Sequence, residues 1–112
     1  MVSQNKNQTG KPYAVTVMFE VSPASYLEFV ELVKVNAHNS VELEPNCFIF
    51  DVLTPATSGA LSKVFLYEVY KDRSAFDYHC ASPHFQSFDV ATKPMVLQKT
   101  VLDYVVDEFR KA

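Results

Sequence analysis

The stretches 13–20, 47–54 and 63–70 combine β-branched and aromatic residues in a way that is typical of β-strands. In all three stretches, apolar residues occupy both alternating sets of positions. An antiparallel sheet that faces water on one side would show a polar residue at every second position. The sequence therefore predicts a sheet that is covered on both faces.

The segments around these strands predict helices. A helix opens at Ser22-Pro23 and is expected to end near residue 39, since serine caps a helix and proline suits its first turn. The ranges 72–81 and 82–94 predict two shorter helices, and 100–106 predicts a last strand. The order βαββαβ, with its second helical unit split, predicts an α+β ferredoxin-like fold with an antiparallel four-stranded sheet and helices on one face. We expect a second copy to cover the other face, in a homodimer packed sheet to sheet.

Length and charge set further bounds. A chain of 112 residues is one domain, which we expect to span 12–112 behind a polar, disordered tail at 1–11. The net charge of -3 argues against nucleic acid or an anionic membrane as the main partner. No apolar run approaches the roughly 20 residues of a membrane span, and the first residues contain no signal-peptide core. Two isolated cysteines form no disulfide framework, so a reducing cytoplasm is the expected location.

Two polar residues stand at positions where the pattern expects core, which indicates a lined pocket for a small molecule. Asn36 shares the predicted buried helix face with Phe29 and Val33. Its amide either bonds a neighbouring carbonyl or orients a substrate oxygen, because a buried amide must be hydrogen-bonded. His79 is either a satisfied core residue or a general base, since its ordinary pKa of about 6.5 allows proton transfer near neutrality.

Two further histidines are secondary candidates for substrate binding. His84 follows the Ser-Pro start of its helix, where a capping or packing role competes with a role at the pocket. His38 lies on the polar face of the first helix, where exposure to solvent is the default.

The predicted strands and the last helix supply the remaining candidates for substrate binding. Tyr67 and Glu68 point to opposite faces of one strand. A carboxylate within an apolar sheet either pairs across the dimer or, with a pKa raised by burial, acts as a base. Phe50 and Phe85 are either core residues or rings that stack on a flat substrate.

No cofactor signature accompanies these residues. The chain has two glycines, so it contains no glycine-rich phosphate loop, and no histidine, cysteine or acidic cluster has metal-ligand spacing. We therefore expect a site that uses neither a metal nor an organic cofactor.

Two sequence blocks carry a family resemblance. They read N-A-x-x-S…E-P-x-C-x-x-F-D-V over 36–52 and Y-E-x-Y-x-D…A-F-x-x-H-x-x-S-P-H-F over 67–85. Across roughly residues 13–106, the chain resembles the antibiotic biosynthesis monooxygenase (ABM) superfamily of dimeric α+β barrel proteins. Asn46 stands where that family usually has glycine, and the turn should tolerate the change because asparagine enters the left-handed region. The chain lacks tryptophan, which the haem-degrading branch uses, so the resemblance argues against that branch.

The resemblance implies an oxidoreductase that works by proton abstraction. His79 would remove a proton from a phenol, quinol or carbon next to a carbonyl, and Asn36, where the family has an asparagine near its pocket, would steady the anion. An electron-rich anion reacts with dioxygen, which implies a cofactor-free monooxygenase or quinol oxidase. A hydroxyketone would instead be isomerised, as by the family's phospho-autoinducer-2 isomerase. A dimer that binds a small molecule without turnover is the third hypothesis.

The loop 55–62 is either a lid or an ordinary surface loop.

Overall fold

The computed structural model describes residues 10–57 and 62–110. Most of the predicted tail (1–9) and the middle of the predicted loop 55–62 (58–61) lie outside these described residues. The elements follow in the order β1 (Tyr13–Val21), η2 (Pro23–Ser25), α1 (Tyr26–Leu43), β2 (Cys47–Leu53), β3 (Lys63–Tyr70), α2 (Arg73–Cys80), α3 (Pro83–Thr92), η4 (Lys93–Met95) and β4 (Val96–Val105). This order confirms the predicted α+β, ferredoxin-like fold.

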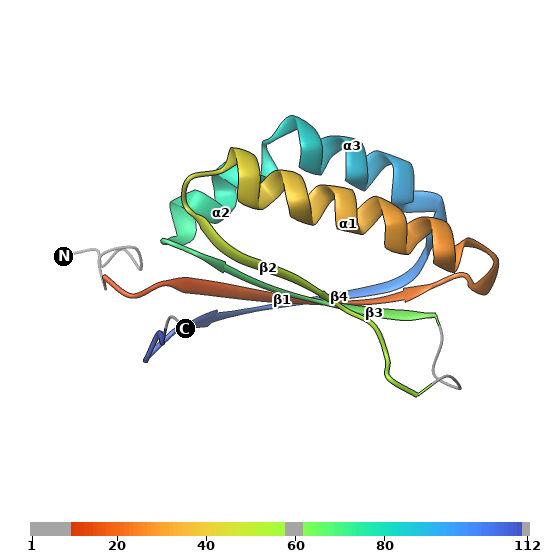
Figure 1. The fold of residues 1–112 in the computed structure, drawn as a ribbon, viewed down its shortest axis with the longest axis horizontal. Helices are drawn as coiled ribbons and strands as arrows, with labels where there is room; N and C mark the ends of the chain where they lie inside the picture. The colour runs from red at the N-terminus through yellow and green to blue at the C-terminus, as the bar shows by residue number, and fades with distance from the viewer. Residues whose placement is uncertain (1–9, 58–61, 111–112) are drawn as a thin grey trace.

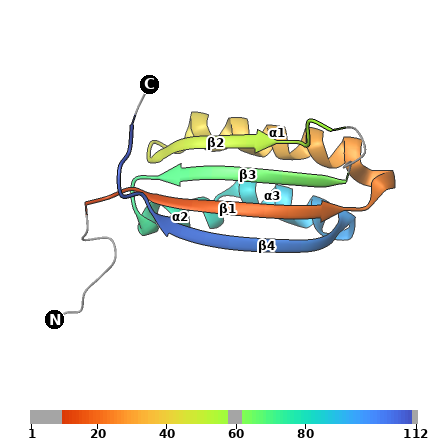
Figure 2. The same ribbon diagram turned by 90° about the horizontal axis from the view of Figure 1, so that it is seen from below.

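The four strands form one antiparallel sheet in the order β2-β3-β1-β4. The three α-helices lie together on one face of this sheet, as the edge-on view of Figure 1 shows. The opposite face is bare in the view from below, where the strands lie in front of the helices (Figure 2). The two inner strands, β3 and β1, therefore run under the helices through the middle of the molecule.

Two boundaries differ from the expectation by four residues. Helix α1 ends at Leu43 and not near residue 39, because Pro45 forces only the residue before it, Glu44, into an extended conformation (φ -108, ψ 108). Strand β4 begins at Val96 and not at residue 100, because its first residues still pair with β1 beyond an irregularity at Glu20/Val21. Strand β3 has the predicted bounds.

The core lies between the helices and the sheet. Phe29 of α1 is fully buried, and its ring packs 4.9 Å from that of Phe19 on β1 and 5.8 Å from that of Phe88 on α3. The buried stripe of α1 continues at helical spacing through Asn36 and Ser40. Aromatic packing thus joins two helices to the central strand. Toward the C-terminal end of α1, polar side chains occupy part of its buried face.

The bare face of the sheet is apolar. Strand alternation and the observed register place Met18, Leu53, Tyr67, Leu102 and Tyr104 on it, and each of these side chains is at least 36% exposed. No helix in the described part of the chain is both long and apolar enough to cross a membrane.

Candidate functional site

A cavity of about 110 Å³ lies between the helix layer and the sheet. Side chains from all four strands and from all three α-helices line it, and most of them are aliphatic or aromatic. The polar and ionisable side chains in this lining are Asn36, Glu68, His79, Cys80 and Lys99. A small apolar cavity with a few convergent polar groups is the usual form of a small-molecule site.

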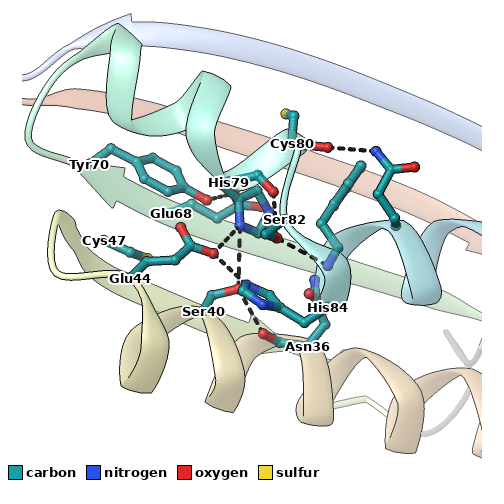
Figure 3. A network of polar contacts seen from close by, with 12 residues as sticks. Asn36, Ser40, Glu44, Cys47, Glu68, Tyr70, His79, Cys80, Ser82 and His84 are labelled. Atoms are coloured by element: carbon teal, nitrogen blue, oxygen red, sulfur yellow. Dashed lines mark hydrogen bonds and ion pairs between the residues drawn. The ribbon is translucent and has the colours of Figure 1, made fainter.

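His79 is held in place by the start and the end of α2. Asp72 caps this helix by accepting a hydrogen bond of 2.9 Å from the Ala75 amide, and the His79 carbonyl accepts one of 2.7 Å from Ser82 Oγ. The imidazole is 2% exposed, and its Nδ1 lies 2.8 Å from Glu44 Oε2 (Figure 3). When Nδ1–H donates to this carboxylate, Nε2 is left as a proton acceptor without a partner among the described residues.

Burial lowers the pKa of His79, although the hydrogen bond and the charge of Glu44 act to raise it. The imidazole is therefore neutral at neutral pH. A neutral imidazole with one nitrogen oriented by a carboxylate is the arrangement that general-base catalysis requires.

Glu44 is the residue that sequence reasoning missed, because it lies beyond residue 39, near which the first helix was expected to end. It follows the last residue of α1 and is 3% exposed, and its Oε2 also lies 2.5 Å from Nε2 of His84. Its other oxygen, Oε1, is buried without a hydrogen-bond partner among the described residues. The sequence did contain a sign of this role. Asn36, Ser40 and Glu44 are spaced four residues apart, and this spacing places side chains on the same face of a helix.

Glu44, His79 and His84 are also the described residues that could hold a metal ion, because their ligand atoms lie within 4.8 Å of one another. Spacing alone could not predict this group, since 35 and 40 residues separate the carboxylate from the two histidines. Both ring nitrogens that face Glu44 already hydrogen-bond to a single carboxylate oxygen. The two imidazoles thus share Oε2 of Glu44, while Oε1 is left without a partner among the described residues.

Glu68 projects from β3 into the cavity and is 3% exposed. The Tyr70 hydroxyl donates a hydrogen bond of 2.6 Å to its Oε1 (Figure 3). Burial raises the pKa of Glu68 to about 7, while the hydrogen bond from Tyr70 acts to lower it. Near neutral pH this carboxyl group is thus divided between its acid and its carboxylate.

Asn36 supplies an unsatisfied polar group to the same cavity. Its side chain is 2% exposed, and Oδ1 has no hydrogen-bond partner in the described part of the chain. Its backbone carbonyl accepts a hydrogen bond of 2.7 Å from Ser40 Oγ, which fixes this turn of α1. A buried amide oxygen without a partner is costly unless a ligand or water satisfies it.

Two aromatic candidates join this site. The rings of Phe50 and Phe85 line the cavity, with centroids 5.7 Å and 5.1 Å from that of His79. His84 does not line the cavity. It stands behind Glu44 and borders an outer groove beside Tyr78, with its side chain 10% exposed.

Two candidates lie away from the cavity. Tyr67 projects from the bare face of the sheet, and His38 is exposed on the outer side of α1. Neither side chain lines the cavity, so the structure does not support the prediction that they bind a substrate there.

Comparison with known proteins agrees with the fold. Solved structures of proteins named provisionally as antibiotic biosynthesis monooxygenases superpose on it with a TM-score of 0.81. One from Bacteroides thetaiotaomicron is 21% identical and covers 88% of this chain and 91% of its own. One from Nitrosomonas europaea is 23% identical, with coverage of 88% and 93%. One from Caulobacter crescentus is 19% identical, with coverage of 88% and 92%.

No curated protein matches the chain in sequence. The family model for antibiotic biosynthesis monooxygenases matches residues 12–90, which is more than half of the chain. This match covers β1 through most of α3, and so includes the cavity residues of every element except β4. The chain therefore belongs to the antibiotic biosynthesis monooxygenase family.

Proposed function

We propose that this protein is a cofactor-independent monooxygenase of a small phenol or carbonyl compound, with His79 as the base that starts the reaction. One observation carries this proposal. A neutral, buried imidazole is oriented by Glu44 through Nδ1, so that Nε2 is left as a base at the wall of an apolar cavity. The family and its provisionally named monooxygenases support the same reaction class.

The cavity favours a substrate with one ring. Its volume is about 110 Å³, whereas an engineered apolar cavity of roughly 150 Å³ accommodates benzene. Phe50 and Phe85 flank His79 and offer faces on which a flat ring can stack. Because the cavity of this protein is the smaller of the two, a phenol is the upper limit of what it admits, a short carbonyl compound fits more easily, and a fused polycyclic compound exceeds the space.

The reaction with a phenol that carries hydrogen at its para carbon can be written with all atoms balanced. His79 Nε2 takes the hydroxyl proton, and electron density moves to the para carbon. That carbon forms a bond to one atom of dioxygen, and the resulting peroxide takes the proton back from His79. Loss of the carbon-bound proton then breaks the O–O bond, so that phenol and dioxygen yield quinone and water.

Asn36 is suited to hold the oxygen on which negative charge develops. Its amide lies in the cavity lining, where the unpaired Oδ1 can accept a hydrogen bond from a substrate hydroxyl, and the amide N–H is the group that would donate to the oxyanion formed from it. An oriented donor in a dry site stabilises such an anion more strongly than water does. We expect Asn36→Leu to lose more turnover than substrate affinity.

Oxygen uptake tests the proposal. The purified protein, stripped of metals, is offered single-ring phenols, benzenediols and their bicyclic counterparts, and dioxygen consumption is followed with an electrode. We expect uptake with single-ring substrates, retained in the control His38→Ala, whose side chain lies outside the cavity, and reduced at least ~100-fold in His79→Ala. Uptake that appears only after Fe²⁺ or Mn²⁺ is added would overturn the cofactor-free mechanism. Tight binding without any uptake would favour a binding dimer.

A second candidate, an isomerase of a small hydroxyketone, is favoured by the presence of two proton-transfer groups in one cavity. His79 would take a proton from the carbon beside the carbonyl, and Glu68 would move protons between the two oxygens, so no oxidant is needed. Solvent deuterium entering a hydroxyketone without dioxygen consumption would identify this reaction.

We also propose that two copies pack through the bare faces of their sheets. The exposed apolar residues of this face, among them Met18 and Leu102, form the kind of surface that usually marks an association site. Light scattering after gel filtration should give twice the chain mass of 12.7 kDa, and a monomer at micromolar concentration would refute this.

We propose a cytoplasmic location on the evidence of the cysteines. Cys47 and Cys80 are both free thiols, and Cys47 is buried. Free thiols are typical of a reducing compartment. Fractionation of cells that express the tagged chain tests this, and recovery outside the cytoplasm would contradict it.

A further inference from the structure

We infer that Glu68 is a second catalytic residue, which in its neutral form donates a hydrogen bond and then a proton to an oxygen of the substrate. The inference rests on the proposed oxygenase reaction, in which His79 alone handles protons. It adds an acid on the sheet side of the cavity to the base on the helix side.

The position of Glu68 leaves one oxygen for a ligand. The side chain is buried on β3 and lines the cavity together with Asn36 and His79. Tyr70 occupies Oε1, whereas Oε2 has no hydrogen-bond partner among the described residues. In the neutral acid the carbonyl oxygen accepts from Tyr70, and the proton resides on Oε2. That proton is available to a molecule in the cavity.

The surroundings favour the neutral form. Burial raises the pKa of Glu68 most strongly, and the negative charge of Glu44 at the end of α1 raises it further. The Tyr70 hydroxyl and the Lys99 cation of β4 act in the opposite direction. The other titratable groups near Glu68 are uncharged at neutral pH, because burial raises the pKa of Cys47 to about 12 and that of Cys80 to about 11, and lowers that of His79.

A neutral acid here has a defined task in the oxygenase reaction. When the O–O bond of the hydroperoxide breaks, the departing oxygen leaves as hydroxide unless a proton reaches it. Glu68 supplies this proton while a base removes the carbon-bound proton, so the products are a carbonyl group and water. The carboxylate that remains regains a proton from solvent before the next turnover. The same donor would protonate the carbonyl oxygen of a hydroxyketone.

Cyclopentanone is a suitable probe, because it is no larger than benzene, has a carbonyl acceptor and does not ionise near neutral pH. Its affinity is measured by NMR titration between pH 5.5 and pH 8.5. We expect wild-type affinity to fall roughly 5- to 10-fold as Glu68 ionises, which is the usual worth of one hydrogen bond. Glu68→Gln keeps a donor but cannot ionise, so its affinity should stay flat. In Tyr70→Phe the fall should move to higher pH, because the Tyr70 hydrogen bond lowers the pKa of Glu68.

Glu28→Gln is the matched control, since Glu28 is an exposed carboxylate on α1 that lies neither in the cavity lining nor on the bare face of the sheet. It should keep the wild-type pH dependence. A flat wild-type profile, a fall that persists in Glu68→Gln, or the absence of cyclopentanone binding would each overturn the inference. A ¹³C titration of the Glu68 carboxyl in the ligand-free protein is an independent test, since a midpoint below pH 5 would also overturn it. These readouts need no turnover, so a failure of the oxygenase proposal is distinguishable from a failure of this one.

Discussion

The buried carboxyl group of Glu68 should make the protein less stable as the pH rises. The group has an ordinary pKa of 4.5 and one of about 7 in the folded protein, where burial penalises its charge. The folded state thus holds the proton more tightly than the unfolded state. The stabilisation that protonated Glu68 contributes is complete below pH 4.5 and is lost as the pH rises through about 7.

The size of the effect follows from these two values. A tenfold change in proton affinity corresponds to about 1.4 kcal/mol, so a rise from 4.5 to about 7 amounts to about 3 kcal/mol. Glu68→Gln removes the titration while its amide oxygen can still accept from Tyr70. The free energy of unfolding of the variant, minus that of the wild type, should therefore rise by about 3 kcal/mol between pH 4.5 and pH 8.5.

Urea denaturation followed by circular dichroism measures this difference, with samples spaced by one pH unit and the protein concentration held constant. Contributions from all other titrating groups are common to both proteins and cancel in the comparison. Glu28→Gln, which changes an exposed carboxylate on α1, should remain parallel to the wild type. If the curves of Glu68→Gln and the wild type also run parallel within about 0.5 kcal/mol, Glu68 is not a raised, buried acid and the reasoning fails.

Four other substitutions test separate parts of the structure. Glu44→Gln should lower turnover by about 10- to 100-fold with little change in KM, since His79 loses its orienting carboxylate; unchanged steady-state kinetics would contradict this role of Glu44. Phe29→Ala should cost about 3–5 kcal/mol in thermal or urea unfolding, because its ring is fully buried. Ser82→Ala should cost about 1 kcal/mol in the same assay, since its hydroxyl caps α3. Leu102→Lys should give a monomer in light scattering if the bare face is the dimer interface.

Most of the fold could be predicted because its determinants are local. Alternating apolar residues mark the strands, and the Ser-Pro pairs mark two helix starts, although the first of them opens η2 before α1 begins. The end of α1 was placed four residues too early because the residues that follow Asn39 neither break nor extend a helix strongly. Only Pro45 supplies a stop signal, and it acts on Glu44.

The site was predictable only in part, because long-range contacts complete it. Polarity on an apolar face identified Asn36, His79 and Glu68, all of which line the cavity. Tyr67, by contrast, does not line the cavity, and the sequence could not show this for a physical reason. Alternation separates residue 67 from residue 68, but when both faces of a strand are apolar it does not tell which face the helices cover. The role of Glu44 was not predicted, because its hydrogen bond with His79 joins residues that are 35 positions apart in the sequence.

The pairing of β1 with β4 has a consequence for how the chain folds during synthesis. Tyr13 lies opposite Val105 in this ladder, so β1, which leaves the ribosome first, can complete its pairing only after β4 has been synthesised. Closing so long a loop costs conformational entropy before the contacts between the two strands can form and stabilise the closed state, and this slows folding. Until residues 96–105 emerge, one edge of β1 remains open to strands of neighbouring nascent chains. Ribosome-bound chains that stop before β4 should therefore be the species most prone to aggregation and most dependent on chaperones.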